Sequence, residues 1–267
     1  MMEVILFICA VFKQKCWVLL SCVLEINFFV QLIMFLILLI SGDIESNPGP
    51  SSLQSLDILH LNIRSIRNKI DSVKHLIQDF HILCFTETHL DPNVLDGHVL
   101  IEGFKNIFRR DRNSFGGGVM IYVSNCLKVR RREDLEPSDT EIIWIEIAQT
   151  VGSLLLCCIY RPPNSNRNFW HKLSWSVEKA NDISQNMLIL GDLNVDFLKL
   201  NTTHEFHTIM ESYSLANIIQ QPTRITRNTS TLIDPIIISE NIQVHDSGII
   251  NVDHSISDHR AAYAPVM

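Results

Sequence analysis

The spacing of apolar residues predicts alternating strands and helices from residue 56 onward. Short apolar runs bounded by turn residues are typical of buried strands, and apolar residues three and four apart are typical of one helix face. Strands are predicted at 56–61, 82–85, 119–123, 141–148, 154–160, 187–190, 236–239, 249–252 and 261–266. Three helices are predicted. The first has Ser65 as cap and the apolar face Ile66, Ile70, Val73 and Ile77. The second has the apolar face Trp170, Leu173, Val177 and Ala180, and the third covers residues 203–213. Many strands with few helices favour two packed sheets with helices outside them.

Two of these strands carry further expectations. Residues 141–148 alternate between polar and apolar side chains, which indicates a half-buried antiparallel strand. Cys157 and Cys158 are neighbours in the run 154–160, so they are expected on opposite faces of a sheet.

The first 41 residues form an apolar segment that differs from the rest of the chain. Residues 17–40 are long enough to span a membrane, but Glu25, Asn27 and Gln31 interrupt them. A charged residue near the centre of a span costs roughly 2.5–3.5 kcal/mol to insert. The uninterrupted part, 28–40, is closer in length to the core of a signal peptide. A membrane or secretory role therefore remains one interpretation of this segment.

Residues 42–50 read Gly-Asp-Ile-Glu-Ser-Asn-Pro-Gly-Pro and resemble the ribosome-skipping (2A-type) peptides of viruses and some retrotransposons. The resemblance implies that the bond between Gly49 and Pro50 is not formed, so that the functional protein begins at Pro50. Proline is a constrained imino acid without an N–H, which gives the effect a physical basis. The alternative is an ordinary Asn-Pro-Gly-Pro turn followed by a linker.

Composition limits where a nucleic acid could bind. The chain has 267 residues, enough to bury a large core, and a net charge of −7. DNA binding would therefore depend on local basic runs such as 109–112 and 130–132. The alternative interpretation of these runs is that they are solvated loop ends. Seven cysteines without a Cys-x-x-Cys pair indicate a reduced intracellular protein, nuclear or cytoplasmic, with buried thiols. A membrane location through the first segment is the alternative.

Polar side chains follow the predicted strands at the points where they end. Together they offer carboxylates, amides, a phenol and an imidazole, which suit binding of a divalent cation and a phosphodiester and activation of water. The residues are Asn62, Glu87, Tyr160, Asp192, Asn194, Asp234, Asp258 and His259.

Several of these residues carry an expectation of their own. In extended backbone Asp192 and Asn194 point to the same side, although Asp-x-Asn is also a common self-capping turn. Asp234 could accept the ring N–H of His259 and so fix its orientation, although a lone histidine is more often structural. Glu87 ends a strand without an evident partner, which a hard cation would satisfy.

The ordered motifs resemble the endonuclease/exonuclease/phosphatase family, and within it the apurinic-type endonuclease domain of non-LTR (LINE-type) retrotransposons. They are Leu-Asn-Ile-Arg-Ser at 61–65, Glu-Thr at 87–88, Tyr-Arg-Pro-Pro at 160–163, Leu-Gly-Asp-Leu-Asn at 190–194, Gln-Pro-Thr-Arg at 221–224 and Ser-Asp-His at 257–259. The resemblance implies an α/β (α+β) four-layered sandwich over residues 51–267, with two mixed sheets flanked by helices. It implies a Mg²⁺-dependent endonuclease that nicks DNA, with Mn²⁺ as a substitute. A reverse transcriptase and element RNA encoded downstream would be further partners.

The resemblance also implies a role for each residue. The metal ligands would be Glu87, Asn62 and Asp258. The catalytic groups would be Asp192, which activates water, Asn194, which holds the phosphate, His259 oriented by Asp234, and Tyr160. Thr223 and Arg64 would contact phosphate or DNA. Arg64 departs from the acidic residue of apurinic repair enzymes, which favours nicking over repair. The alternatives are a phosphatase or lipid phosphodiesterase of the same superfamily and a catalytically silent remnant.

Overall fold

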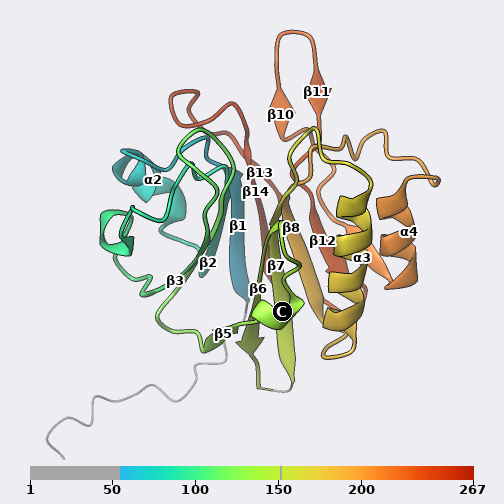
Figure 1. Ribbon diagram of the computed structural model, residues 1–267. Coiled ribbons are helices and arrows are strands. Elements are labelled where there is room, and N and C mark those ends of the chain that lie inside the picture. Colours follow the sequence, from blue (N-terminus) through green and yellow to red (C-terminus); the bar gives the residue numbers. More distant parts are fainter. Residues whose placement is uncertain (1–54, 151) are drawn as a thin grey trace, which may run out of the picture. The chain divides into compact units, whose positions relative to one another are not determined.

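Two six-stranded sheets pack face to face in the computed structural model, which describes residues 55–150 and 152–267 (Figure 1). The first sheet is built from Leu56–Asn62 (β1), Ile82–Thr86 (β2), Asn106–Arg110 (β3), Val119–Val123 (β4), Gly248–Ile250 (β13) and Ala261–Val266 (β14). Its spatial order is β13-β14-β1-β2-β4-β3. Strands β1 and β2 are parallel, whereas β14 runs antiparallel to β1.

The second sheet has the same mixed character. It is built from Val129–Arg131 (β5), Glu141–Ala148 (β6), Ser153–Tyr160 (β7), Met187–Asp192 (β8), Leu215–Asn217 (β9) and Ile236–Ser239 (β12). Its order is β5-β6-β7-β8-β12-β9, with β7 and β8 parallel and β12 antiparallel to β8. A separate hairpin, Arg224–Ile225 (β10) and Ser230–Thr231 (β11), projects beyond the strand ends (Figure 1).

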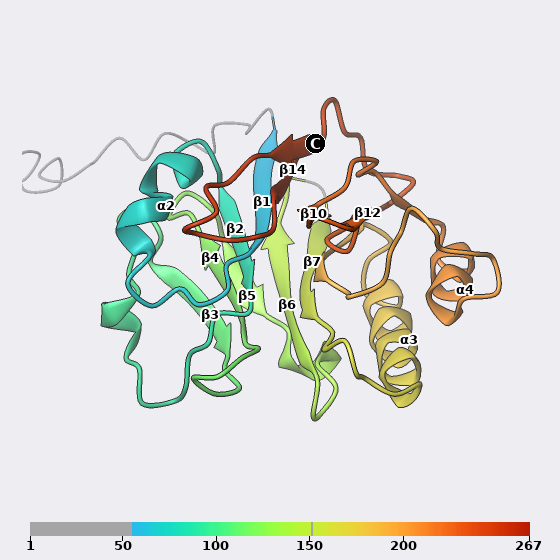
Figure 2. The ribbon, with the colours of Figure 1, turned by 90° about the horizontal axis from the view of Figure 1, so that it is seen from above.

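Helices cover the outer face of each sheet and complete four layers. Helix α2 (Ile70–Ile77) lies outside the first sheet, and α3 (Asn168–Asn181) and α4 (Glu205–Ser212) lie outside the second (Figure 2). Short 3-10 turns occur at Asp96–His98 and Glu133–Leu135. The predicted four-layered sandwich of two mixed sheets is therefore confirmed. Among the described residues, no helix is both long and apolar enough to cross a bilayer. The predicted apolar segment and skipping peptide, residues 1–50, lie outside the described residues.

Three apolar cores hold the layers together, and strand alternation assigns residues to them. In β7, Leu154, Leu156 and Cys158 face the core between the sheets, whereas Leu155 and Cys157 face helix α3. The prediction that Cys157 and Cys158 point to opposite faces is confirmed. Both are buried, as is Cys84, but Cys126 is exposed, so the prediction of buried thiols holds for three of the four described cysteines.

Strand β6 is more deeply buried than its alternation suggested. It is antiparallel to both neighbours, as predicted, but residues 142–145 are buried on both faces. Trp144 packs under α3, where its ring N–H donates to Ser176 at 2.8 Å, and Ile143 and Ile145 fill the core between the sheets. The prediction of a half-buried strand was wrong because a helix covers the second face.

The predicted helix after β1 begins later than expected. Helix α2 starts at Ile70 without a side-chain cap, and Ser65 has a left-handed φ of 78°. Backbone N–H groups of Ser65 and Ile66 donate to the carbonyls of Glu87 and Thr88. The chain therefore continues beside the extension of β2, which removes Ser65 from the helix end. Ile66 is still fully buried, as its apolar position predicted.

The two arginine runs begin on edge strands that the apolar pattern did not predict, β3 and β5, and continue just beyond the ends of these strands. Each guanidinium that is described there has an acidic partner. The ion pairs are Arg109 with Asp96 and Asp111, Arg110 with Glu136, Arg112 with Glu141, Arg130 with Glu146, Arg131 with Glu136 and Glu133, and Arg132 with Asp134 and Glu146. These runs therefore form neither solvated loop ends nor an uncompensated basic patch.

Candidate active site

The polar residues gather at one end of the space between the sheets. Parallel β1 and β2 end at Asn62 and Thr86, and parallel β7 and β8 end at Tyr160 and Asp192. Strands β12 and β14 run antiparallel to β8 and β1, so the segments before them begin at the same end. Those segments carry Asp234 and His259. The predicted convergence of polar strand ends is thus a consequence of sheet topology.

Strand alternation aims several of these side chains inward. In β8, Leu188 and Leu190 face the core between the sheets, and Asp192 continues that face at the strand end. Ile58 sets the same face in β1, which Asn62 continues. Asn62 Nδ2 accordingly donates to Asp192 Oδ2 at 2.8 Å across the two sheets.

Asp192 is buried and held through both oxygens. Its Oδ1 accepts the backbone N–H of Asn194 at 2.9 Å, in addition to the Asn62 bond on Oδ2. Burial and the negative charge of Asp234 together raise the pKa of Asp192 to about 7, against His259 and the two hydrogen bonds. A carboxyl group with this pKa can exchange a proton near neutral pH.

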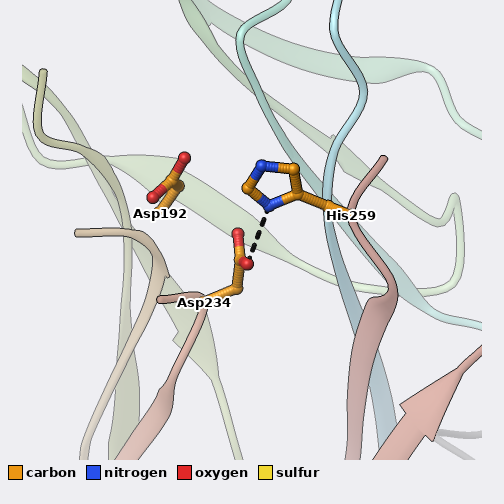
Figure 3. Close-up of side chains that lie close together, drawn as sticks. All are labelled: Asp192, Asp234 and His259. Atoms are coloured by element: carbon orange, nitrogen blue, oxygen red, sulfur yellow. Dashed lines mark hydrogen bonds and ion pairs between the residues drawn. The ribbon is translucent and has the colours of Figure 1, made fainter. Parts of the chain in front are cut away.

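Asp234 and His259 form a buried pair beside Asp192 (Figure 3). The distance between His259 Nδ1 and Asp234 Oδ2 is 2.9 Å. Burial opposes the imidazolium, but Asp234, with smaller contributions from Asp192 and Asp258, raises the pKa of His259 to about 9. At neutral pH both ring nitrogens then carry protons, and the second nitrogen points away from Asp234 (Figure 3).

Thr223 lies behind this pair and not on the open side. Its hydroxyl donates to Asp234 Oδ2 at 2.6 Å and accepts the N–H groups of Ile233 and Asp234. The side chain is fully buried, so the structure shows it positioning Asp234 instead of the expected contact with phosphate.

Glu87 has a partner that the sequence did not reveal. The hydroxyl of Tyr160 donates to Glu87 Oε1 at 2.8 Å, and His89 Nε2 lies 3.4 Å from Oε2. Glu87 follows Thr86, so regular alternation would aim it toward the α2 layer, but its φ of 51° leaves the strand conformation. A left-handed φ costs a residue other than glycine about 1 kcal/mol or more, and here it accompanies a contact with the opposite sheet.

Asn194 departs from the extended backbone that the sequence argument assumed. Its φ is 49°, its N–H caps the Asp192 side chain, and its Nδ2 donates to the carbonyl of Arg161 at 2.9 Å. The self-capping turn, weighed as the alternative, is what the structure shows. Just before this turn, Gly191 permits the close approach of β8 to β7, because a Cβ there would lie 1.8 Å from the carbonyl oxygen of Ile159.

Asp258 lies between two arginines, although it was expected on the metal side. Its Oδ1 is 3.1 Å from Arg64 Nη1, and its Oδ2 accepts from Arg224 Nε and Nη2 at 3.1 and 3.0 Å. These guanidinium groups satisfy the charge that a cation was expected to satisfy.

Three further polar residues join the site. His60 is fully buried, with Nε2 3.2 Å from Thr86 Oγ1 and Nδ1 3.9 Å from Asp234 Oδ1. Ser257 donates to the carbonyl of Asn62 at 2.6 Å. Arg224 holds Asp258, as described above. The sequence signal was present in each case, because His60 is a polar residue inside an apolar strand and the other two belong to quoted motifs.

Two sets of groups could hold a metal ion. Asp192, Asp234 and His259 each offer a ligand atom within 4.8 Å of the others. Glu87 and Asn62 offer the hard oxygen donors that Mg²⁺ prefers, at the ends of neighbouring strands. In the first set His259 Nδ1 and Asp234 Oδ2 already pair with each other at 2.9 Å, and the imidazole offers nitrogen where Mg²⁺ prefers oxygen. The residues therefore fit a divalent cation best on the Glu87 side.

Three solved structures illustrate the fold. The endonuclease domain of TRAS1, a telomere-specific non-LTR retrotransposon, has a TM-score of 0.60 and 14% identity over 79% of this chain and 98% of that one. The 3′ phosphatase NExo from Neisseria, bound to product DNA hairpin, has a TM-score of 0.62 and 16% identity over 78% and 98%. The AP endonuclease LMAP from Leishmania major has a TM-score of 0.65 and 12% identity over 79% and 87%. At these identities the likeness concerns the fold alone.

The assignment of the chain to a protein family rests on a family model and not on the structural similarity. A comparison with curated protein sequences gives no significant match. The model of the Endonuclease/Exonuclease/phosphatase family matches residues 59–259, which include all the site residues described above. The chain therefore belongs to the endonuclease/exonuclease/phosphatase family of metal-dependent hydrolases that act on phosphodiester bonds.

Proposed function

We propose that this protein is a Mg²⁺-dependent DNA endonuclease that nicks one strand and leaves an end for priming reverse transcription. The observation that carries the proposal is the buried Asp192, held by Asn62 from the opposite sheet and placed beside the Asp234–His259 pair. This arrangement offers one group to take a proton from water and another to neutralise charge on a phosphate. The retrotransposon-type motifs favour DNA as the substrate.

Asp192 acts as the base in this mechanism. Asn62 and the backbone N–H of Asn194 orient its carboxylate, and its pKa near 7 lets it accept a proton from water at neutral pH. His259 acts as the donor to the phosphoryl oxygens, since Asp234 keeps it protonated through Nδ1 and leaves Nε2–H for the substrate. Thr223 fixes Asp234 from behind.

Glu87 and Asn62 are the groups that would hold the cation, with Tyr160 orienting the Glu87 carboxylate. When bound, Mg²⁺ supplies Lewis-acid polarisation of the phosphodiester and stabilises developing negative charge. Mn²⁺ has a similar preference for oxygen donors and is expected to substitute. Asn194 has its side-chain amide on Arg161, so its contribution is to orient Asp192 through its N–H.

The test is nicking of supercoiled plasmid by the purified full chain. We expect nicking with Mg²⁺ or Mn²⁺ and none with EDTA. Asp192→Asn and His259→Gln are each expected to slow nicking about 10²- to 10⁴-fold, the usual contribution of a general acid or base. Asp182→Asn, at the exposed C-terminal end of α3, and His171→Gln, on the exposed side of this helix, make the same changes elsewhere and should leave nicking unchanged.

Two results would overturn the proposal. One is undiminished nicking by both site variants. The other is hydrolysis of phosphoinositides without nicking of plasmid, which would support a lipid phosphodiesterase.

A further inference from the structure

A group of three charged side chains beside the active site is not used by the mechanism above. Asp258 lies between Arg64 and Arg224 and contacts both, with one carboxylate oxygen for each arginine. We name Arg64, Asp258 and Arg224 the arginine clamp. It joins the loop after β1 to strand β10 of the hairpin, through residues far apart in the chain.

The clamp carries more positive than negative charge. Two guanidinium groups share one carboxylate, and within residues 55–150 and 152–267 neither arginine forms an ion pair with another acidic side chain. The arginines on β3 and β5 differ, because nearby carboxylates balance their positive charge. Arg109, for example, pairs with both Asp96 and Asp111. A site with one excess positive charge suits an anion of one negative charge.

Both arginines keep donors for a ligand. The side chain of Arg64 is 55% exposed and that of Arg224 is 40% exposed, whereas Asp258 between them is only 24% exposed. Arg224 uses Nε and Nη2 on Asp258, and Arg64 uses Nη1. A guanidinium has five N–H donors in a planar fork that matches phosphate oxygens.

The backbone around the clamp is fixed before any ligand binds. Lys69 Nζ donates to the carbonyls of Ile63, Arg64 and Ile256 at 3.0, 2.9 and 2.6 Å. Ser257 donates to the carbonyl of Asn62, and the backbone of Arg224 forms a β-bridge with His259. A site that is ordered in advance loses less entropy when it binds.

We infer that the arginine clamp binds a DNA backbone phosphate next to the one that is cleaved. The backbones of Arg224 and His259 form a β-bridge, and Asp258 is the chain neighbour of His259, so the clamp lies next to the group proposed to contact the cleaved phosphate. A phosphodiester carries one negative charge and presents two free oxygens, one for each guanidinium. The sequence predicts a DNA contact for Arg64 but gives no role to Arg224. The inference rests on the proposed function, because it takes DNA as the substrate.

The test measures binding without cleavage. The full chain, in EDTA, is titrated onto a short fluorescein-labelled DNA duplex at several NaCl concentrations between about 50 and 200 mM. Each phosphate that is neutralised contributes about 0.9 to the slope of log K against log salt concentration. We expect Arg224→Gln and Arg64→Gln each to weaken binding and to reduce that slope by about 0.9, whatever the duplex sequence.

Matched variants separate the clamp from other effects. Because the two arginines share one phosphate, the double variant should lose about as much slope as either single variant. Arg224→Lys keeps the charge and the slope but loses the fork, so it should bind more weakly at every salt concentration. Arg167→Gln, at the start of α3 and paired with Glu205, should match the wild type in both respects. Thermal melting of each variant checks that it folds.

Equal slopes for the wild type, Arg64→Gln and Arg224→Gln would overturn the clamp, as would absence of DNA binding by the wild type. Additive loss in the double variant would overturn the sharing of one phosphate. Failure of the proposed function gives a different result, in which the slopes change as expected but no divalent cation supports nicking.

Discussion

His60 is a fully buried histidine whose surroundings oppose its protonation. Burial, with a smaller contribution from His259, lowers its pKa to about 4 against the charge of Asp234. The unfolded chain has the ordinary histidine pKa near 6.5, so between pH 6.5 and 4 the unfolded state binds a proton that the folded state does not. The stability that neutral His60 contributes is therefore present above pH 6.5 and is lost as the pH falls.

This loss can be measured by urea unfolding at pH 7 and pH 5. A difference of one pKa unit corresponds to 1.36 kcal/mol, so the wild type should lose about 2 kcal/mol over this interval through His60. His60→Gln keeps a polar group near Thr86 but does not titrate. Its free energy of unfolding should therefore decrease between pH 7 and pH 5 by about 2 kcal/mol less than that of the wild type. Equal pH dependence in the two proteins would show that His60 is not buried in its neutral form.

Edge strands β3 and β5 belong to different sheets, and Glu136 joins them. Its side chain is only 4% exposed and accepts from Arg110 on β3 and from Arg131 on β5, and Arg131 also donates to the carbonyl of Arg109. Removing one member of a buried ionic group leaves the remaining charges uncompensated. The two arginines are each about a quarter exposed, which reduces the penalty below that of a fully buried group.

Glu136→Gln should therefore lower the free energy of unfolding by about 2 kcal/mol. The matched control is Glu133→Gln, since Glu133 is 78% exposed and lies 3.8 Å from Arg131. Its substitution should cost less than about 0.5 kcal/mol. Urea unfolding of both variants measures the difference, and equal losses would mean that Glu136 does not tie the sheets together.

These edge strands are also elements that the sequence did not predict. All nine strands predicted from apolar runs are present, since a buried strand needs apolar side chains and that need is visible in the sequence. Strands β3 and β5 contain arginines in place of a continuous apolar run, and distant residues help to stabilise them, as Glu136 does for Arg110, so no local pattern marks them. The predicted start of α2 was wrong for a similar reason, because Ser65, the expected cap, pairs with the extension of β2.

The active site depends on the packing of the two sheets against each other. Asn62, Glu87 and His259 belong to segments of the first sheet, and Tyr160, Asp192 and Asp234 to segments of the second. Asn62 and Asp192 are 130 positions apart, and their contact follows from which faces meet, which periodicity does not specify. The motifs therefore predicted which polar residues gather at the strand ends, whereas the link from Tyr160 to Glu87 and the pairing of Asp258 with two arginines required the fold.

The form in which the whole chain is made depends on residues 42–50. We propose that translation skips the bond between Gly49 and Pro50, so that the enzyme begins at Pro50 and is released from the apolar segment. Translation of the full reading frame in vitro, with the products separated by size, should give two bands, the larger matching residues 50–267. Pro50→Ala restores an ordinary acceptor with an N–H, so it should give one full-length band. Ser51→Ala, one residue further on, is the control and should still give two bands. A single full-length band from the unaltered sequence would contradict skipping, and the apolar segment would then remain attached to the enzyme and could direct it to a membrane.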